Sequence, residues 1–166
     1  MKKNILLITY NFVPNSPTFG SVARCTYLYK HLKGLGLGVN VLSVGGNDYG
    51  YFGHDDLDSK DLYYVKSNLK LKKQQQFNAK GRKTGSLVKG FIKPVLQFFN
   101  NNVMVPDYSI TSILSVYFKS IELIDKNNIN SVIISAPPHG LSLVLLLLKK
   151  KRPNINYILE YRDSWN

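Results

Sequence analysis

The residues best suited to chemistry lie together near the end of the chain, in "YILEYRDSWN" (157–166). Residues 157–159 have the apolar character of a buried strand. Two acids, one arginine and the single tryptophan of the chain follow within the next six residues. Charged and aromatic side chains directly after a buried strand are typical of a binding site, because the carboxyl ends of parallel strands are where ligands bind.

Three residues of this stretch are candidate ligand contacts. Arg162 and Asp163 either form a local ion pair that organises the turn or contact ligand hydroxyl groups. Trp165 either stacks on a ligand ring, such as a sugar, or covers the core. Residue types alone leave both alternatives open for each side chain.

A second candidate is the histidine in "SAPPHG" (135–140). His139 comes directly after an apolar run of strand length, and a histidine at that place can hydrogen-bond a hydroxyl group or act as a base. The alternative is a histidine that only caps the following helix. The two prolines before it suit entry into a helix.

A third candidate is "PTFGS" (17–21), which separates the first apolar run from the first helical pattern. A glycine there, Gly20, lets backbone N–H groups at a helix N-terminus approach a phosphate, and Ser21 follows it. A plain turn explains the same letters. The richer "GLGLG" (34–38) comes after a helical pattern, where glycines end helices, so it is not interpreted as a dinucleotide fingerprint.

Metal ligands with a recognisable spacing are not found. Cys25 is the only cysteine, and His31 and His54 lie on a helical pattern and in a loop pattern, respectively. Metal sites in proteins need several such side chains at close spacing. We therefore predict neither a metal site nor a cofactor.

Alternating strand and helix patterns must position these candidates. Near-continuous apolar runs predict strands, and apolar residues at helical spacing predict helices. The predicted strands are 4–10, 39–44, 62–65, 131–136 and 155–161. The predicted helices run from Ser21 to about Gly34, from about Ser109 to Lys126, and from "PPHG" to about Lys151.

This alternation predicts an α/β fold: a Rossmann-like three-layer sandwich with a mainly parallel sheet in the order 3-2-1-4-5. Ligands of such sheets bind at the carboxyl ends of the strands, near the point where the strand order reverses. That point lies between the first and fourth strands. The segments around 17–21, 135–140 and 161–165 are therefore expected to converge on one edge.

Composition limits the compartment and the partner. Lys and Arg total 22 against 10 Asp and Glu, so the net charge of +12 favours an anionic partner. The single cysteine permits no internal disulfide and fits a reducing compartment. The longest apolar stretch, 141–148, is far shorter than the roughly 20 residues that span a bilayer. We expect one cytoplasmic domain that does not cross the membrane.

Residues 66–93 differ from the rest, because they hold nine Lys or Arg and no acid. The segment is either a solvated basic loop or an insertion whose interleaved apolar residues lie on an anionic membrane surface. Nucleic-acid binding is not expected, since no DNA- or RNA-binding signature accompanies it.

Four motifs together resemble the amino-terminal half of a family 4 glycosyltransferase of the GT-B type. They occur in the expected order and cover the chain nearly end to end. They are "ILLITYNFVPNSPTFGSVARCTYLYKHLKGLGLGVNVLSV" (5–44), "VPD" (105–107), "SVIISAPPHGLSLVLLLLKKKRP" (131–153) and "YILEYRDSW" (157–165).

The resemblance implies an acceptor-binding domain, covering 1–166, of an enzyme that moves a sugar from a nucleotide-sugar donor to an acceptor. It implies polysaccharide or glycoconjugate synthesis, retention of configuration, no metal requirement, and a sugar or lipid-linked acceptor. It also implies that a carboxyl-terminal donor-binding domain is absent from these residues, so that residues 1–166 alone are inactive. The alternative is a standalone basic Rossmann-like module that binds an anionic ligand or nucleic acid without catalysis.

The resemblance also implies residue roles. Gly20 and Ser21 would lie beside the donor phosphates, and His139 would face the acceptor or the transferred sugar as the catalytic candidate. The acceptor side would be shaped by Asp107, Arg162, Asp163 and Trp165.

Overall fold

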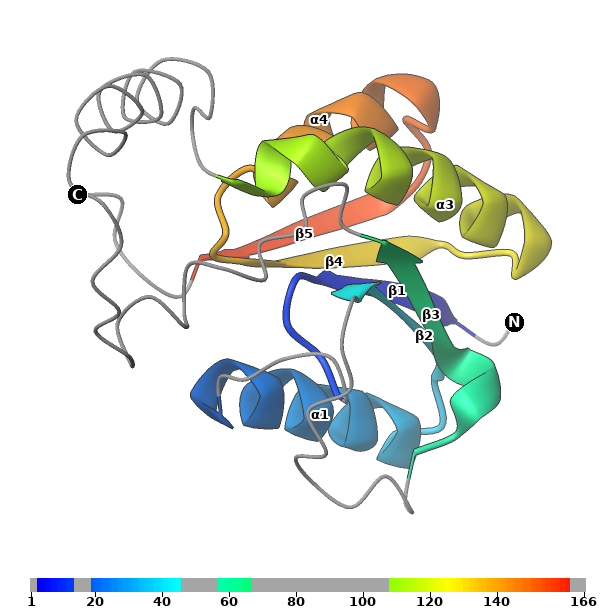
Figure 1. The fold of residues 1–166 in the computed structure, drawn as a ribbon. Helices are drawn as coiled ribbons and strands as arrows, with labels where there is room; N and C mark the ends of the chain where they lie inside the picture. The colour runs from blue at the N-terminus through cyan, green and yellow to red at the C-terminus, as the bar shows by residue number, and fades with distance from the viewer. Residues whose placement is uncertain (1–2, 14–18, 46–56, 67–107, 162–166) are drawn as a thin grey trace, which may run out of the picture.

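A computed structural model describes residues 3–13, 19–45, 57–66 and 108–161 (Figure 1). Five strands form one sheet in the order β3-β2-β1-β4-β5, and every neighbouring pair is parallel. The strands are β1 (Asn4–Thr9), β2 (Gly38–Gly45), β3 (Leu62–Lys66), β4 (Ser131–Ala136) and β5 (Asn156–Tyr161). The predicted Rossmann-like fold and its strand order are confirmed.

Helices cover both faces of this sheet (Figure 1). The helix α1 (Phe19–Gly34) lies on one face, and α3 (Ile113–Lys126) and α4 (Leu141–Lys151) lie side by side on the other. Two short 3-10 helices precede β3 and α3: η1 (Ser59–Asp61) and η2 (Tyr108–Ser112). This is the three-layer arrangement that parallel strands require, since both of their faces must be buried.

The central strand β1 shows why the sheet has two apolar faces. Its residues Ile5 to Thr9 are all buried. Successive side chains of a strand point to opposite faces. Leu6 and Ile8 accordingly join the cluster beneath α3 and α4, whereas Leu7 joins the cluster beneath α1.

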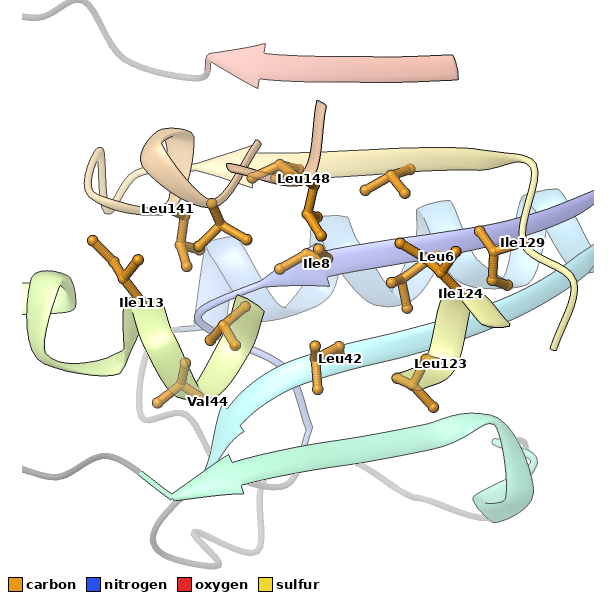
Figure 2. Packing of buried hydrophobic residues seen from close by; sticks show 14 residues of the cluster. Leu6, Ile8, Leu42, Val44, Ile113, Leu123, Ile124, Ile129, Leu141 and Leu148 are labelled. Carbon is orange, nitrogen blue, oxygen red and sulfur yellow. The ribbon is translucent and has the colours of Figure 1, made fainter. Parts of the chain in front are cut away.

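The larger cluster fills the space between the sheet and the α3/α4 layer (Figure 2). Leu123 from α3 and Leu141 and Leu148 from α4 are fully buried against β1, β2 and β4. The smaller cluster holds α1 to the opposite face through Val22, Cys25 and Tyr29, among others. Both layers are therefore fixed to the strands whose ends form the site.

Glycines end α1 as predicted. Gly36 has a φ of 77°, the left-handed conformation that glycine adopts without a steric penalty. Its N–H donates to the carbonyl of Lys33 at 2.9 Å, and the N–H of Leu37 donates to that of Leu32 at 3.3 Å. These two hydrogen bonds form a Schellman motif, which ends the helix, so "GLGLG" has a structural explanation.

All three predicted helix starts differ from the structure. α1 begins at Phe19 rather than at Ser21, so Gly20 lies inside its first turn. Residues 109–112 belong to a 3-10 helix rather than to α3. The "PPHG" segment precedes α4, which begins only at Leu141, because the N–H groups of Leu141 and Ser142 bond back to the carbonyls of Pro138 and His139. The peptide bonds before both prolines are cis.

The prediction that residues 157–159 form a buried strand is wrong in part. β5 lies at the edge of the sheet, and Ile158 is 53% exposed. Tyr157 and Leu159 pack against the cluster beneath α3 and α4. Because side chains alternate along a strand, Ile158 points to the α1 face. There α1 packs against the central strands, and no β5 side chain belongs to its cluster of described residues.

Candidate functional site

The carboxyl ends of β1, β4 and β5 meet at one edge of the sheet. Thr9 pairs with Ser135, and Ala136 pairs with Tyr161, so these strands end at nearly the same level. α1 and α4 both begin at this edge (Figure 1). The predicted convergence at the point where the strand order reverses is present for the described segments.

His139 lies in the connection between β4 and α4 and is half-buried. Its ring stacks on that of Tyr161, with 5.7 Å between the centroids and 29° between the planes. Its carbonyl accepts hydrogen bonds from the Ser142 N–H at 3.0 Å and the Ser142 hydroxyl at 2.6 Å. The predicted histidine is therefore held from its backbone and from its ring, in a half-exposed position at the edge.

An ion pair joins α1 to β5 at the same edge. The Arg24 guanidinium donates through Nη2 to Oε1 of Glu160. The Arg24 side chain is 55% exposed, whereas that of Glu160 is only 22% exposed. The second carboxylate oxygen, Oε2, is buried and has no hydrogen-bond donor among the described residues. The pair thus links the first turns of α1 to the end of β5.

A buried polar layer lies directly beneath this edge. The Thr9 hydroxyl lies 3.4 Å from Sγ of Cys25, and that sulfur lies 3.9 Å from the Ser135 hydroxyl. The Thr9 hydroxyl also donates to the carbonyl of Asn11 at 3.2 Å. These contacts join β1, β4 and α1, and they give the lone cysteine a packing role.

The segment after β1 is anchored by the neighbouring strands. The Ser43 hydroxyl donates to the carbonyl of Tyr10 at 3.1 Å, and the Tyr64 hydroxyl donates to that of Val13 at 2.6 Å. Partial burial raises the pKa of Tyr64 to about 12, so its hydroxyl keeps the proton that it donates. These bonds fasten residues 10–13 to β2 and β3, and Phe12 and Val13 join the buried cluster beneath α1.

Gly20 lies in the first turn of α1 and is exposed. A Cβ added to it would meet no atom within 4 Å. Packing therefore gives no reason for a glycine at this position, and its contact with a phosphate stays a prediction. The backbone of Ser21 follows in the same turn.

Four predicted acceptor-side residues lie outside the described residues: Asp107, Arg162, Asp163 and Trp165. The basic segment 66–93 also lies outside them, apart from Lys66 at the end of β3. Their predicted roles stay predictions.

The site contains three described residues that the sequence did not single out individually. Arg24 and Glu160 form the ion pair, and Tyr161 stacks on His139. Glu160 carried a signal, because a charge that ends an apolar strand indicates a contact at the carboxyl edge. The sequence signal for Arg24 was weaker, because an arginine within a helical pattern is equally expected on the solvent-exposed face of the helix.

No group of three or more His, Cys, Asp or Glu side chains in 3–13, 19–45, 57–66 and 108–161 is arranged to hold a metal ion. No helix in this part of the chain has both the length and the apolar character needed to cross a bilayer.

Comparison of the chain with protein-family models, with characterised proteins and with solved structures finds no significant match. Function is therefore inferred from the sequence motifs and from the geometry of the site.

Proposed function

We propose that residues 1–166 form the acceptor-binding domain of a GT-B-type glycosyltransferase that uses a nucleotide-sugar donor. The observation that carries the proposal is the convergence of His139, the first turns of α1 and the end of β5 where the strand order reverses. In open parallel α/β sheets this is the place where ligands bind. The order of the sequence motifs favours glycosyl transfer among the functions that such a sheet supports.

The chemistry of the edge suits a ligand rich in hydroxyl groups. The imidazole of His139 lies half-exposed at this edge and can donate or accept a hydrogen bond. Rings such as His139 and Tyr161 commonly border ligand pockets, where polar groups fix the orientation of the ligand. We assign to His139 the contact with the transferred sugar or with the attacking acceptor hydroxyl.

The helix N-terminus adds a place for negative charge. The first N–H groups of α1 have no acceptor within the helix, and they attract anions. Gly20 in this turn would let the diphosphate of a donor approach the backbone. In this proposal a second domain outside these residues holds most of the donor, the reaction proceeds with retention, and no metal is required.

The proposal includes a location at the cytoplasmic face of the membrane, with a sugar or lipid-linked acceptor. The basic segment 66–93 supports it, because clustered lysines and arginines are attracted to anionic lipid.

A sugar-transfer assay tests the proposal. The polypeptide of the whole natural reading frame would be mixed with radiolabelled UDP-glucose, UDP-N-acetylglucosamine or GDP-mannose and a lipid extract of the source cells. We expect transfer of label to the extract with one donor, and no turnover by residues 1–166 alone. Because positioned acid–base groups contribute about 10²–10⁴-fold to rate, His139→Ala should lower kcat by about that factor.

His31→Ala is the matched control, because His31 lies exposed on α1 away from the edge. It should leave the rate unchanged. Full activity of His139→Ala would contradict the role of His139. Turnover by purified 1–166 would contradict the two-domain reading, and saturable binding of RNA without any transfer would favour the standalone module.

A further inference from the structure

The outer surface of α3 and α4 carries large apolar side chains that no described element covers. Leu114 and Phe118 lie four residues apart on α3, with exposed fractions of 64% and 65%. On α4 the corresponding side chains are Leu143, Leu146 and Leu147 at 36%, 62% and 39%. Spacings of three and four residues place such side chains on one side of a helix.

The two helices form one continuous surface. Both pack on the same face of the sheet, and both contribute to the same buried cluster (Figures 1 and 2). Arg152, directly after α4, donates to both carboxylate oxygens of Asp125 on α3, at 3.2 and 2.7 Å. We refer to the exposed residues of 113–126 and 141–151 as the α3–α4 outer face.

The charge of this face is positive. Its two acids are already paired, Glu122 with Lys119 at 2.6 Å and Asp125 with Arg152 at 2.7 Å. Four further lysines are exposed at the carboxyl ends of the helices and have no ion pair with a described residue: Lys126, Lys149, Lys150 and Lys151. Apolar side chains bordered by uncompensated lysines have the composition of a surface that binds anionic lipid.

We propose that the α3–α4 outer face docks on an anionic lipid bilayer, with both helices parallel to its plane. The leucines and Phe118 enter the boundary between head groups and acyl chains, and the lysines contact the anionic head groups. The lysine stems extend along the apolar surface while their ammonium groups stay at the head groups. This inference is independent of the transferase proposal, because it uses no residue of the candidate site.

A second copy of the chain is a less suitable occupant. The net charge of +12 makes two copies repel each other, whereas it attracts an anionic bilayer. The α3–α4 outer face would bind lipid partly through apolar side chains. The basic segment 66–93 would be attracted to anionic lipid mainly through its charge. Substitutions of the apolar residues separate the two contributions.

Co-sedimentation with vesicles tests the docking face. The probe is a vesicle of phosphatidylcholine and phosphatidylglycerol, with pure phosphatidylcholine as the uncharged reference. Leu146→Glu should weaken partition by about tenfold, as expected when a leucine side chain no longer leaves water. The control is Leu35→Glu, because Leu35 is 63% exposed against 62% for Leu146 but follows α1. It adds the same charge and should keep most of the binding.

Phe118→Glu changes a second exposed side chain of the same face and should weaken partition in the same way. It replaces Leu146→Glu in the test if that variant folds poorly. The lysines are tested by changing 149–151 together to glutamine. Their control is the same change at Lys3, Lys30 and Lys60, which are exposed outside this face and outside the basic segment 66–93. Loss of three charges from α4 should weaken partition more than loss of three charges elsewhere.

A fluorescent label gives a direct readout of insertion. Cys25 is fully buried, so a thiol-reactive environment-sensitive dye would attach selectively to Leu146→Cys or Leu35→Cys. We expect a blue shift with anionic vesicles for the first protein and none for the second. Equal losses for Leu146→Glu and Leu35→Glu, or no blue shift, would overturn the proposal. A dimer in light scattering that Leu146→Glu dissociates, with partition unchanged, would instead identify the face as an interface between copies.

Discussion

The ion pair between Arg24 and Glu160 gives the most informative perturbation of the site. Arg24→Gln removes the cation, and Glu160→Gln removes the carboxylate charge at nearly constant volume. The two partners are unequally buried, since the side chain of Arg24 is 55% exposed and that of Glu160 is 22% exposed. This inequality predicts that the two substitutions have different costs.

The magnitudes follow from what each variant leaves behind. Without Arg24, Glu160 keeps a mostly buried carboxylate whose Oε2 already lacks a donor among the described residues. A buried group left without its partner costs about 1–3 kcal/mol. Because Arg24 is half exposed, we place Arg24→Gln at the low end, about 1–2 kcal/mol. Without the Glu160 charge, Arg24 is hydrated by water, so Glu160→Gln should cost about 0.5 kcal/mol, within the range of exposed pairs.

Urea unfolding followed by circular dichroism would measure all four proteins of the double-mutant cycle. We expect a coupling free energy of about 0.5–1 kcal/mol and unchanged m-values, since the surface exposed on unfolding is the same. A coupling of zero would show that the pair does not hold α1 to β5. A larger cost for Glu160→Gln than for Arg24→Gln would refute the argument from burial.

Three other predictions concern the framework that positions the site. Leu148→Ala removes a fully buried side chain from the cluster beneath α4 and should lower the free energy of unfolding by about 2–5 kcal/mol in urea titrations. Gly36→Ala meets no steric obstacle but keeps a φ of 77°, so it should cost about 1–2 kcal/mol of conformational strain in the same assay. Burial and the hydrogen bond to Asp61 raise the pKa of Tyr29 to about 12, above its unfolded value of 10. The stability from this group is therefore complete below pH 10 and lost as the pH rises toward 12, so the advantage of the native protein over Tyr29→Phe should shrink across that interval; an advantage that stays constant would contradict the assignment.

The sequence predicted the fold well because its strongest signals are local. The apolar run of β1 predicts a strand buried on both faces. The glycines after α1 predict the end of a helix. The strand order followed from the alternation of elements. The edge position of β5 was also predicted. The predicted burial of Ile158 was wrong, because the apolar residues of a strand do not show whether a helix covers it.

The candidate site was predictable only in part. The position of His139 followed from its place after β4, since the carboxyl ends of parallel strands share an edge. The pairing of Arg24 with Glu160 joins residues 136 positions apart, and no local pattern contains it. The stacking of Tyr161 on His139 likewise depends on the register between β4 and β5. Such contacts arise from tertiary structure, and sequence spacing does not record them.

The central claim is that the carboxyl edge of the sheet is the binding edge of an acceptor domain, where the start of α1 also contacts the diphosphate of the nucleotide-sugar donor. Its most direct test is a titration of isotope-labelled 1–166 with UDP-glucose and GDP-mannose, followed by NMR of the backbone amides, because this method detects weak binding. We predict that the shifted amides cluster at Gly20, His139 and Tyr161 for one of the donors. Shifts confined to the opposite edge, around Gly38 and Asn130, or no shifts with either donor, would contradict the account.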